Sequence, residues 1–398
     1  MRVAIITESF PPDVNGVANS VVRVAEHLVA RGHEPMVIAP QPALGSTRVP
    51  NPLPYPVVRV PSVGMPGYPG FRLGLPGQRI TSALRRHRAD VVHLASPFVL
   101  GAWGSAVATR MRLPMVAVYQ TDVPRFASYY RMARGERAAW AWMRRVHRRA
   151  ARTLAPSSST AAELLAHGID DVWLWRRGVD SALFDPRHRD EATRRALAPG
   201  GELLVGYVGR LAAEKRVELL RAVTARQDVR VVVVGDGPAR ESLQRTMPRA
   251  VFVGERHGSQ LARIYASLDI FVHTGPLETF CQAVQEALAS GVPVVAPAAG
   301  GPLDLVEPGR TGYLVTPDDG AAIVRAVADL ASDPVRRRHF GLAARASVRH
   351  RTWAAVGDEL IAHYRAVCGL STVDELAALE RASRPRTRRD APSEASIG

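Results

Sequence analysis

The chain has 398 residues, of which 46% are hydrophobic and 22% are charged, an ordinary balance for a folded protein. This length is sufficient for two domains with separate hydrophobic cores. No apolar run reaches the roughly 18 residues needed to span a bilayer, and two cysteines, Cys281 and Cys368, exclude a disulfide framework. The opening MRVAIITESF is typical of a buried strand and not of a signal peptide, so a cytoplasmic protein is expected.

The formal net charge of +15 is concentrated in the first half of the chain. Residues 1–178 carry 23 Lys and Arg against 10 Asp and Glu, whereas residues 179–398 carry 29 against 27. Such an excess is typical of a surface that meets nucleic acid, an anionic membrane or an acidic substrate, and a solvated arginine-rich surface explains it equally well. No nucleic-acid-binding motif accompanies the charge, so nucleic acid is not an expected partner.

Apolar runs of strand length alternate with segments of helical period, a pattern typical of parallel sheets covered by helices on both faces. The first half predicts strands over residues 3–7, 36–39, 57–60, 91–94, 115–119, 153–155 and 172–174. The second half repeats the pattern within residues 203–210, 229–235, 250–254, 269–275, 293–297 and 312–315. Within the first half, the Pro- and Gly-rich residues 41–77 predict one strand in a surface excursion that is either mobile or rigid.

Two doubly wound, Rossmann-like α/β domains that face each other across a cleft follow from this pattern. We expect the first over residues 1–177 and the second over residues 178–355. A helical region runs from 335 to about 369, and residues 356–380 are a candidate to return to the first domain. Residues 381–398 lack apolar anchors, so a disordered tail is expected.

In open α/β sheets, ligands bind beyond the carboxyl ends of the strands, and three such places contain informative residues. In the first, Arg210 and Lys215 follow the strand of VGYVGRLAAEK, near a predicted helix start that also favours anions. Two cations at this point suit a diphosphate. Lys215 is the one lysine of the chain, and its compact ammonium approaches a phosphate in ways that a planar guanidinium cannot. The alternative is a solvated lysine in a helix's first turn.

In the second place, Glu278 follows a strand and Glu286 lies eight residues further on, in a helix predicted over 279–289. Carboxylates accept hydrogen bonds from vicinal hydroxyls, so this pair suits a sugar at one end and a ribose at the other. Alternatively, Glu278 is a first-turn residue favoured by the helix dipole, and Glu286 is a surface glutamate. The N–H groups at the helix start are predicted to receive phosphate or sugar oxygens, and they belong to Phe280, Cys281 and Gln282.

The third place is the loop TESFPPDVNG, where Gly16 permits a close approach of backbone to a ligand before a helix begins. The loop is not G-x-G-x-x-G, and no acidic residue follows the second strand at the expected place. A nicotinamide cofactor is therefore not expected.

Together these residues resemble glycosyltransferase family 4, the retaining nucleotide-sugar transferases with the two-domain GT-B fold. The resemblance covers residues 1–370 and rests on the loop ending in Gly16, GRLAAEK, VVGDGP, the Glu-x7-Glu motif, ASGVPVVA and AGGPLDLVEPGRTGYLV. More narrowly, LETFCQAVQEALASGVPVVAP and VYQTDVPRFASYY are similar to actinobacterial GDP-mannose-dependent α-mannosyltransferases that build glycolipids at the inner membrane face.

The resemblance implies a role for each motif residue. Arg210 and Lys215 would hold the diphosphate, Glu278 the donor sugar and Glu286 the ribose hydroxyls, while Gly16 would approach the β-phosphate when the cleft closes. Neither a metal ion nor another cofactor is expected, because the two cations take over the task of the metal.

One departure concerns the loop after the fifth predicted strand of the first domain. Many family members have His-Thr there, whereas this chain has Gln120-Thr121-Asp122. Gln120 can hydrogen-bond the sugar but cannot take a proton, which fits a mechanism in which the leaving phosphate deprotonates the acceptor. Asp122 is an alternative for polar or charge stabilisation.

Residues 129–152 combine tryptophans with an arginine cluster, as amphipathic helices at an anionic bilayer do. The segment predicts docking on an acidic membrane that supplies a lipid-linked acceptor. Alternatively, the tryptophans pack into the first domain and the arginines are solvated. The residues in question are Trp140, Trp142, Arg144, Arg145, Arg148 and Arg149.

The expected function is transfer of mannose from GDP-mannose to a glycolipid or lipid-linked acceptor with retained α configuration, by a cytoplasmic enzyme attached to the inner face of the membrane. Three alternatives remain: a UDP-sugar-dependent transferase with a soluble acceptor, a sugar-nucleotide epimerase of the same architecture, and a degenerate transferase kept as a membrane-binding module. The intact carboxylates and cations argue against degeneration.

Overall fold

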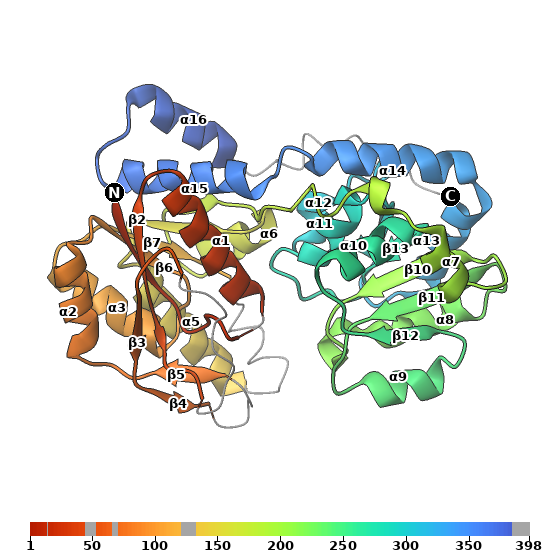
Figure 1. Cartoon of the computed structure of the whole chain (residues 1–398), viewed down its shortest axis with the longest axis horizontal. Coiled ribbons are helices and arrows are strands. Elements are labelled where there is room, and N and C mark those ends of the chain that lie inside the picture. Colours follow the sequence, from red (N-terminus) through yellow and green to blue (C-terminus); the bar gives the residue numbers. More distant parts are fainter. Residues whose placement is uncertain (14, 44–52, 66–70, 121–132, 384–398) are drawn as a thin grey trace. The chain divides into compact units, whose positions relative to one another are not determined.

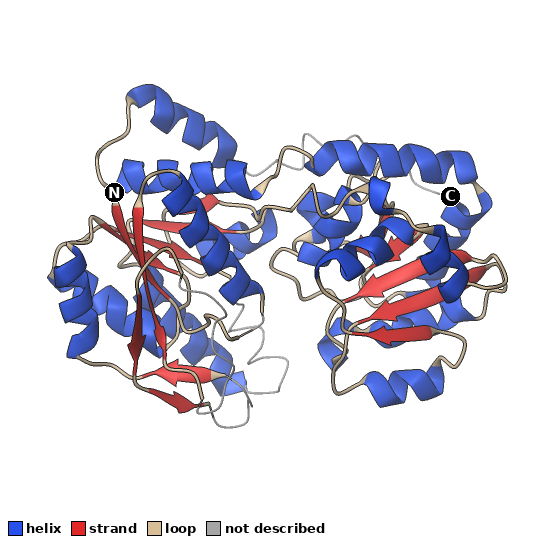
Figure 2. Cartoon of the chain, viewed as in Figure 1, coloured by secondary structure: helices blue, strands red, loops and turns tan. Residues whose placement is uncertain are grey.

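A computed structural model describes residues 1–13, 15–43, 53–65, 71–120 and 133–383. The chain divides into two compact units, Met1–Arg176 with Val356–Gly398, and Arg177–Ala355. In each unit, helices cover a parallel sheet (Figures 1 and 2). Among the described residues, no helix is both long and apolar enough to cross a membrane.

The first unit contains a parallel sheet of order β3-β2-β1-β6-β7-β8-β9. The order reverses between β1 and β6, which is where doubly wound folds bind ligands. Each of its strands overlaps a predicted one: β1 (Arg2–Ile6), β2 (Glu34–Pro40), β3 (Val57–Val60), β6 (Val91–Leu94), β7 (Met115–Val118), β8 (Arg152–Ala155) and β9 (Val172–Leu174).

Alternate residues of β1 supply the two cores of this unit, because successive side chains of a strand point to opposite faces. Val3 and Ile5 pack with α1 (Gly16–Ala30) and with the part of α15 (Trp353–Val367) that follows Val356. Ala4 and Ile6 pack on the other face, with α2 (Gln78–His87), α3 (Val99–Arg110) and α5 (Ala133–His147). The other helices among the described residues of this unit are α6 (Ser158–Ala166) and α16 (Val373–Ser383).

Val356, Leu360 and Tyr364 of α15 are part of the core that contains Val3 and Ile5. The buried Tyr364 hydroxyl lies 2.5 Å from Nδ1 of His93, and the Trp175 indole donates to the Val356 carbonyl at 2.9 Å. The helix α16 extends to Ser383, so the tail predicted from residue 381 begins inside a helix. Its remaining residues, 384–398, lie outside the described part of the chain.

The prediction of a single strand within residues 41–77 was wrong. Besides β3, this region forms an antiparallel pair, β4 (Ser62–Gly64) and β5 (Arg72–Gly74). These strands read SVG and RLG, and neither is the apolar run by which the other strands were predicted.

The two tryptophans of α5 have different environments. Trp140 is 4% exposed and stacks on His167, with ring centroids 3.7 Å apart, so its ring belongs to the core and is not available to a membrane. Trp142 is 42% exposed, and its indole donates to the Pro97 carbonyl at 2.7 Å. The alternative prediction, that tryptophans of this segment pack into the first domain, is therefore confirmed for Trp140.

The second unit contains a parallel sheet of order β12-β11-β10-β13-β14-β15. Buried side chains of α10 (Gly258–Ser267) and α11 (Gln282–Ala289) pack on one face of this sheet. Those of α8 (Arg221–Thr224), α9 (Arg240–Thr246) and α13 (Gly320–Ser332) pack on the other.

The strands of the second unit are β10 (Leu203–Val208), β11 (Val229–Val234), β12 (Val251–Gly254), β13 (Ile270–Val272), β14 (Val294–Pro297) and β15 (Gly312–Val315). Its α-helices are α7 (Glu191–Leu197), α8 (Arg221–Thr224), α9 (Arg240–Thr246), α10 (Gly258–Ser267), α11 (Gln282–Ala289), α12 (Pro302–Leu305), α13 (Gly320–Ser332) and α14 (Pro334–Val348). Its 3₁₀ helices are η1 (Pro186–His188), η2 (Ala213–Lys215) and η3 (Val217–Leu220).

We expect Trp140→Ala to lower the free energy of unfolding by about 3–5 kcal/mol, because it removes a buried ring. The matched control, Trp142→Ala, removes a half-exposed ring with one hydrogen bond, and its cost should be about 1 kcal/mol. Urea unfolding followed by circular dichroism measures both values. Equal losses in the two variants would contradict the assignment of Trp140 to the core.

Candidate functional site

Lys215, His273 and Glu278 meet at the carboxyl ends of β10 and β13. Oε1 of Glu278 accepts a hydrogen bond from Nζ of Lys215 at 2.6 Å and lies 3.4 Å from Nε2 of His273. The Thr274 hydroxyl donates to the Lys215 carbonyl at 2.6 Å, which connects the two loops directly. The structure therefore brings together two residues that the sequence predicted separately, Lys215 and Glu278.

The charges of this cluster stabilise one another. Burial opposes ionisation of Glu278, but Lys215 and His273 outweigh it and lower the pKa of the carboxyl to about 2. Burial also opposes the charged form of His273, yet the neighbouring Cys281 sulfur and Glu278 raise its pKa to about 10. Arg177 interacts with the same carboxylate, although burial lowers its pKa to about 10. Three cations around one carboxylate leave a positive site that suits a diphosphate.

Backbone contacts hold the Glu278 loop in place. The N–H of Gly301 donates to the Glu278 carbonyl at 2.8 Å. A Cβ atom on Gly301 would lie 2.0 Å from the Phe280 carbonyl oxygen, a distance that no side chain permits. The loop after β14 can pack this closely on residues 278–280 because glycine stands at this position.

The helix predicted over 279–289 begins at Gln282 instead. Its N-cap, Cys281, has φ 73° and ψ 73°, a left-handed conformation that costs a non-glycine residue about 1 kcal/mol or more. This conformation cannot continue a helix toward Thr279. Within the described ranges, the N–H groups of Phe280, Cys281 and Gln282 have no acceptor, so their binding of ligand oxygens stays a prediction.

Glu286 is half-buried on α11. Burial raises the pKa of its carboxyl to about 7, although the Tyr265 hydroxyl and the Gln282 side chain favour the ionised form. The same helix is hydrogen-bonded to the first residues of the second unit. The Gln282 side-chain amide donates to the Gly178 carbonyl at 3.1 Å, and the Gln285 amide donates to the Arg177 carbonyl at 2.9 Å. This contact of Gln285 was not predicted, because nothing in the neighbouring sequence indicates that its side chain is fully buried.

Arg210 is exposed two residues after β10. The Tyr207 hydroxyl donates to its carbonyl at 3.2 Å, and the Tyr207 ring lies parallel to that of His273 with centroids 6.3 Å apart. Arg210 therefore adjoins the Lys215 cluster. The helix start predicted near Arg210 and Lys215 is formed by the short 3₁₀ turns η2 and η3, and the α-helix α8 begins only at Arg221.

In the first unit, Asn15 caps α1, since its side-chain oxygen accepts from the N–H groups of Val17 and Ala18 at 3.0 Å each. Gly16 is exposed at the first helical position. The Gln120 amide follows β7 and donates to the Ala95 carbonyl at 3.3 Å. Asp122 lies outside the described residues. The donor-binding roles of Gly16 and Gln120 stay predictions.

Glu8, which follows β1 and is 1% exposed, was not predicted from the sequence. Its carboxylate accepts from the N–H groups of Leu100 and Gly101 at 2.5 and 3.3 Å and from the Ser96 hydroxyl at 2.5 Å. Burial raises its pKa to about 7. These contacts place a carboxylate at the N-terminus of α3, where the helix dipole favours it.

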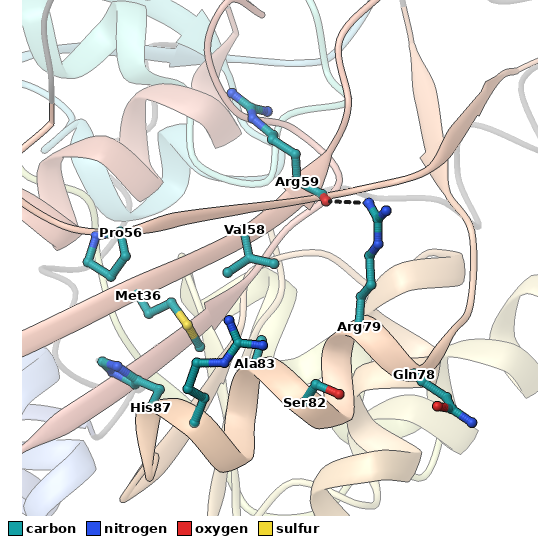
Figure 3. A pocket seen from close by; sticks show the side chains of 10 residues that line it. Met36, Pro56, Val58, Arg59, Gln78, Arg79, Ser82, Ala83 and His87 are labelled. Carbon is teal, nitrogen blue, oxygen red and sulfur yellow. Dashed lines mark hydrogen bonds between the residues drawn. The ribbon is translucent and has the colours of Figure 1, made fainter.

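A separate groove of about 630 Å³ opens between β3 and α2 in the first unit (Figure 3). Apolar side chains of Met36, Val58 and Ala83 line part of it. Arginines also line it, and Arg79 donates to the Arg59 carbonyl at 3.4 Å. The groove contains none of the residues predicted to bind the donor.

Two parallel-sheet α/β units of this kind are the architecture of the GT-B fold class. Residues 14–183 match Glycosyltransferase Family 4, and residues 188–347 match Glycosyl transferases group 1. The chain belongs to glycosyltransferase family 4, which confirms the resemblance.

Two relatives and one solved structure show how far the similarity extends. A GDP-mannose-dependent alpha-mannosyltransferase of Mycolicibacterium smegmatis is 52% identical over 93% of this chain and 98% of the relative. One of the same description from Corynebacterium glutamicum is 47% identical over 93% of this chain and 90% of its own length. Sucrose-phosphate synthase from Thermosynechococcus elongatus has the same fold, with a TM-score of 0.78 and 21% identity over 93% of this chain and 100% of that chain.

We expect binding of the nucleotide-sugar donor to weaken as the pH falls through about 7, because Glu286 is ionised above that pKa and neutral below it. Glu286→Gln should weaken donor use by about ten- to a hundredfold, through loss of a charge-assisted contact of roughly 1.5–3 kcal/mol, and should remove the pH step. Donor KM measured across this pH range tests both effects. An unchanged pH profile in the variant argues against the assignment.

Proposed function

We propose that this glycosyltransferase moves mannose from GDP-mannose onto a glycolipid or lipid-linked acceptor with retention of the α configuration. The observation that carries the proposal is the contact between Lys215 and Glu278, which combines a cation for a diphosphate with a carboxylate for sugar hydroxyls. High identity to two enzymes described as GDP-mannose-dependent alpha-mannosyltransferases supports the choice of donor.

In the proposed reaction, the bond between C1 of mannose and the β-phosphate oxygen breaks, and C1 bonds to the acceptor hydroxyl oxygen on the same face of the sugar. The acceptor proton passes to the leaving phosphate oxygen, so no protein side chain is needed as a base. Lys215 and Arg210 stabilise the charge that develops on the β-phosphate. To do so, Lys215 exchanges part of its contact with Glu278, and the carboxylate then accepts hydrogen bonds from the mannose hydroxyls.

A donor screen tests this function. A saturating donor at a hundred times its dissociation constant should stabilise the folded protein by about 2.7 kcal/mol, and we expect GDP-mannose to exceed UDP- and ADP-sugars in a thermal-shift assay. Transfer to lipid extracts, with the anomeric configuration read by NMR, then identifies the product. Stabilisation by a UDP-sugar alone overturns the donor assignment, and conversion of the donor without acceptor indicates an epimerase.

Lys215→Ala is expected to lower kcat by about 10²–10³, because a group that stabilises the leaving phosphate is removed. The matched control is Arg216→Ala, which removes the next cation, whose side chain pairs with Asp318 at 2.7 Å on the surface. Steady-state kinetics with saturating GDP-mannose measure both variants. Similar kcat values for Lys215→Ala and the control are incompatible with the role of Lys215.

We further propose that the first unit docks on an anionic membrane. The helices α2, α3 and α5 cover one face of its sheet, which brings the arginine-rich helices α2 and α5 to the same side of the unit. Exposed arginines of these two helices are Arg79, Arg85, Arg86, Arg137 and Arg145. Other arginines are engaged within the unit, since Arg144 and Arg148 donate to the carbonyls of His167 and Gly168, and Arg149 donates to the Ser105 hydroxyl. The surface for docking therefore combines α2 with α5.

Reversing three of these charges should reduce vesicle binding by about a hundredfold, since each basic residue near an acidic surface contributes about 1 kcal/mol. The test is co-sedimentation at low salt with phosphatidylglycerol vesicles, using phosphatidylcholine vesicles as reference. The variant is R79E/R86E/R145E, and the charge-matched control in the second unit is R256E/R325E/R338E. Absence of wild-type binding, or equal losses in both variants, contradicts the docking surface.

A further inference from the structure

His273, Glu278 and Cys281 form a cluster of three different metal-ligating groups in the second unit. Their ligand atoms, an imidazole nitrogen, a carboxylate oxygen and a thiol sulfur, all lie within 4.8 Å of one another. His273 is 2% exposed and Cys281 is 4% exposed, while the Glu278 side chain is 19% exposed. The cluster is therefore enclosed but can be reached from the side of Glu278.

The imidazole of His273 has unused binding capacity. In the described part of the chain, neither of its ring nitrogens forms a hydrogen bond, and the contact of Nε2 with Oε1 of Glu278 is an ion pair at 3.4 Å. Buried polar atoms are normally hydrogen-bonded, so a buried imidazole that lacks a hydrogen bond and lies beside a carboxylate and a thiol points to a ligand.

The backbone of Cys281 gives a second, independent indication. Its φ of 73° is a conformation in which glycine is the usual residue. A side chain at this strained position places sulfur beside His273 and Glu278. Strain of this kind collects at binding sites.

Nitrogen, oxygen and sulfur donors together suit a borderline-soft ion such as Zn²⁺. With bonds of about 2.0–2.3 Å, tetrahedral Zn²⁺ holds its ligand atoms about 3–4 Å apart, which agrees with the 3.4 Å between His273 and Glu278. Three protein ligands leave a fourth position for water or an anion. The ion competes with Lys215, which occupies the same carboxylate oxygen at 2.6 Å.

We propose that His273, Glu278 and Cys281 bind Zn²⁺ or a similar transition-metal ion, in exchange for Lys215 and for the protons of the imidazole and the thiol. The bound ion takes the carboxylate that the sugar donor needs and repels the ammonium that the diphosphate needs. Metal binding therefore inhibits donor binding. The metal site itself does not depend on which sugar or nucleotide the enzyme uses, whereas the inhibition rests on the proposed function.

Calorimetric titration of the full chain, without a histidine tag, with ZnCl₂ tests the site directly. We expect binding of one ion, and we expect C281G and H273Q each to weaken it by at least about tenfold, because loss of even an outer-shell partner has that effect. C281G is suitable because glycine adopts the left-handed conformation without strain, so the fold is kept. The control is C368S, which removes the other thiol and should bind as the wild type does.

Cobalt provides a spectroscopic readout, since a thiolate bound to Co²⁺ gives a charge-transfer absorption that C281G should abolish. K215M should bind Zn²⁺ more tightly, because the competing ammonium is absent. Lack of wild-type binding, or equal affinity in wild type, C281G and H273Q, overturns the proposal, and the latter result indicates an adventitious site. Unaltered affinity in K215M contradicts the exchange with Lys215.

Kinetics test the consequence for the donor. Zn²⁺ should raise the KM for GDP-mannose in the wild type and raise it less in C281G. A chain that binds Zn²⁺ but does not turn over GDP-mannose keeps the metal site and loses only the proposed function. A chain whose donor KM is unaffected by bound Zn²⁺ disproves the inhibition.

Discussion

A buried carboxylate stays ionised only where nearby cations offset the cost of removing its charge from water. In the second unit, the residues around Glu278 supply such cations. Lys215 contacts it from the loop after β10, His273 from the end of β13, and Arg177 interacts with it from the start of the unit. Together these cations carry more charge than the one carboxylate neutralises. The arrangement that stabilises the ionised Glu278 therefore also supports the proposal that this site binds the diphosphate.

The two glutamates of the Glu-x7-Glu motif differ because of their surroundings. Cations lower the pKa of Glu278 to about 2, whereas burial raises that of Glu286 to about 7 despite its polar neighbours Tyr265 and Gln282. One carboxylate is permanently ionised and the other titrates near neutrality. Two carboxyl groups on one short segment are thus suited to different parts of a ligand. Their pKa values differ because their surroundings differ, although both residues are glutamates.

The strands of both sheets could be predicted because each is a short apolar run bounded by turn residues. Prediction failed where local pattern carries no information. The strands of the β4/β5 pair contain no apolar run. The helix α11 begins at Gln282 because Cys281 is left-handed, a conformation that its residue type does not indicate. Trp140 and Trp142 are two residues apart on an arginine-rich helix, yet only the fold distinguishes the buried ring from the exposed one.

The sequence by itself determined the fold class, the family and the segments that carry Lys215, Glu278 and Glu286, because apolar runs and motif residues are local properties of the chain. Tertiary structure decided which of these side chains meet. Lys215 and Glu278 are 63 residues apart and become neighbours because β10 pairs with β13, although β11 and β12 intervene in the sequence. Crossover connections between parallel strands set this order. Proximity at the strand ends, and with it the charge and metal-binding chemistry of the site, is therefore a property of the assembled sheet.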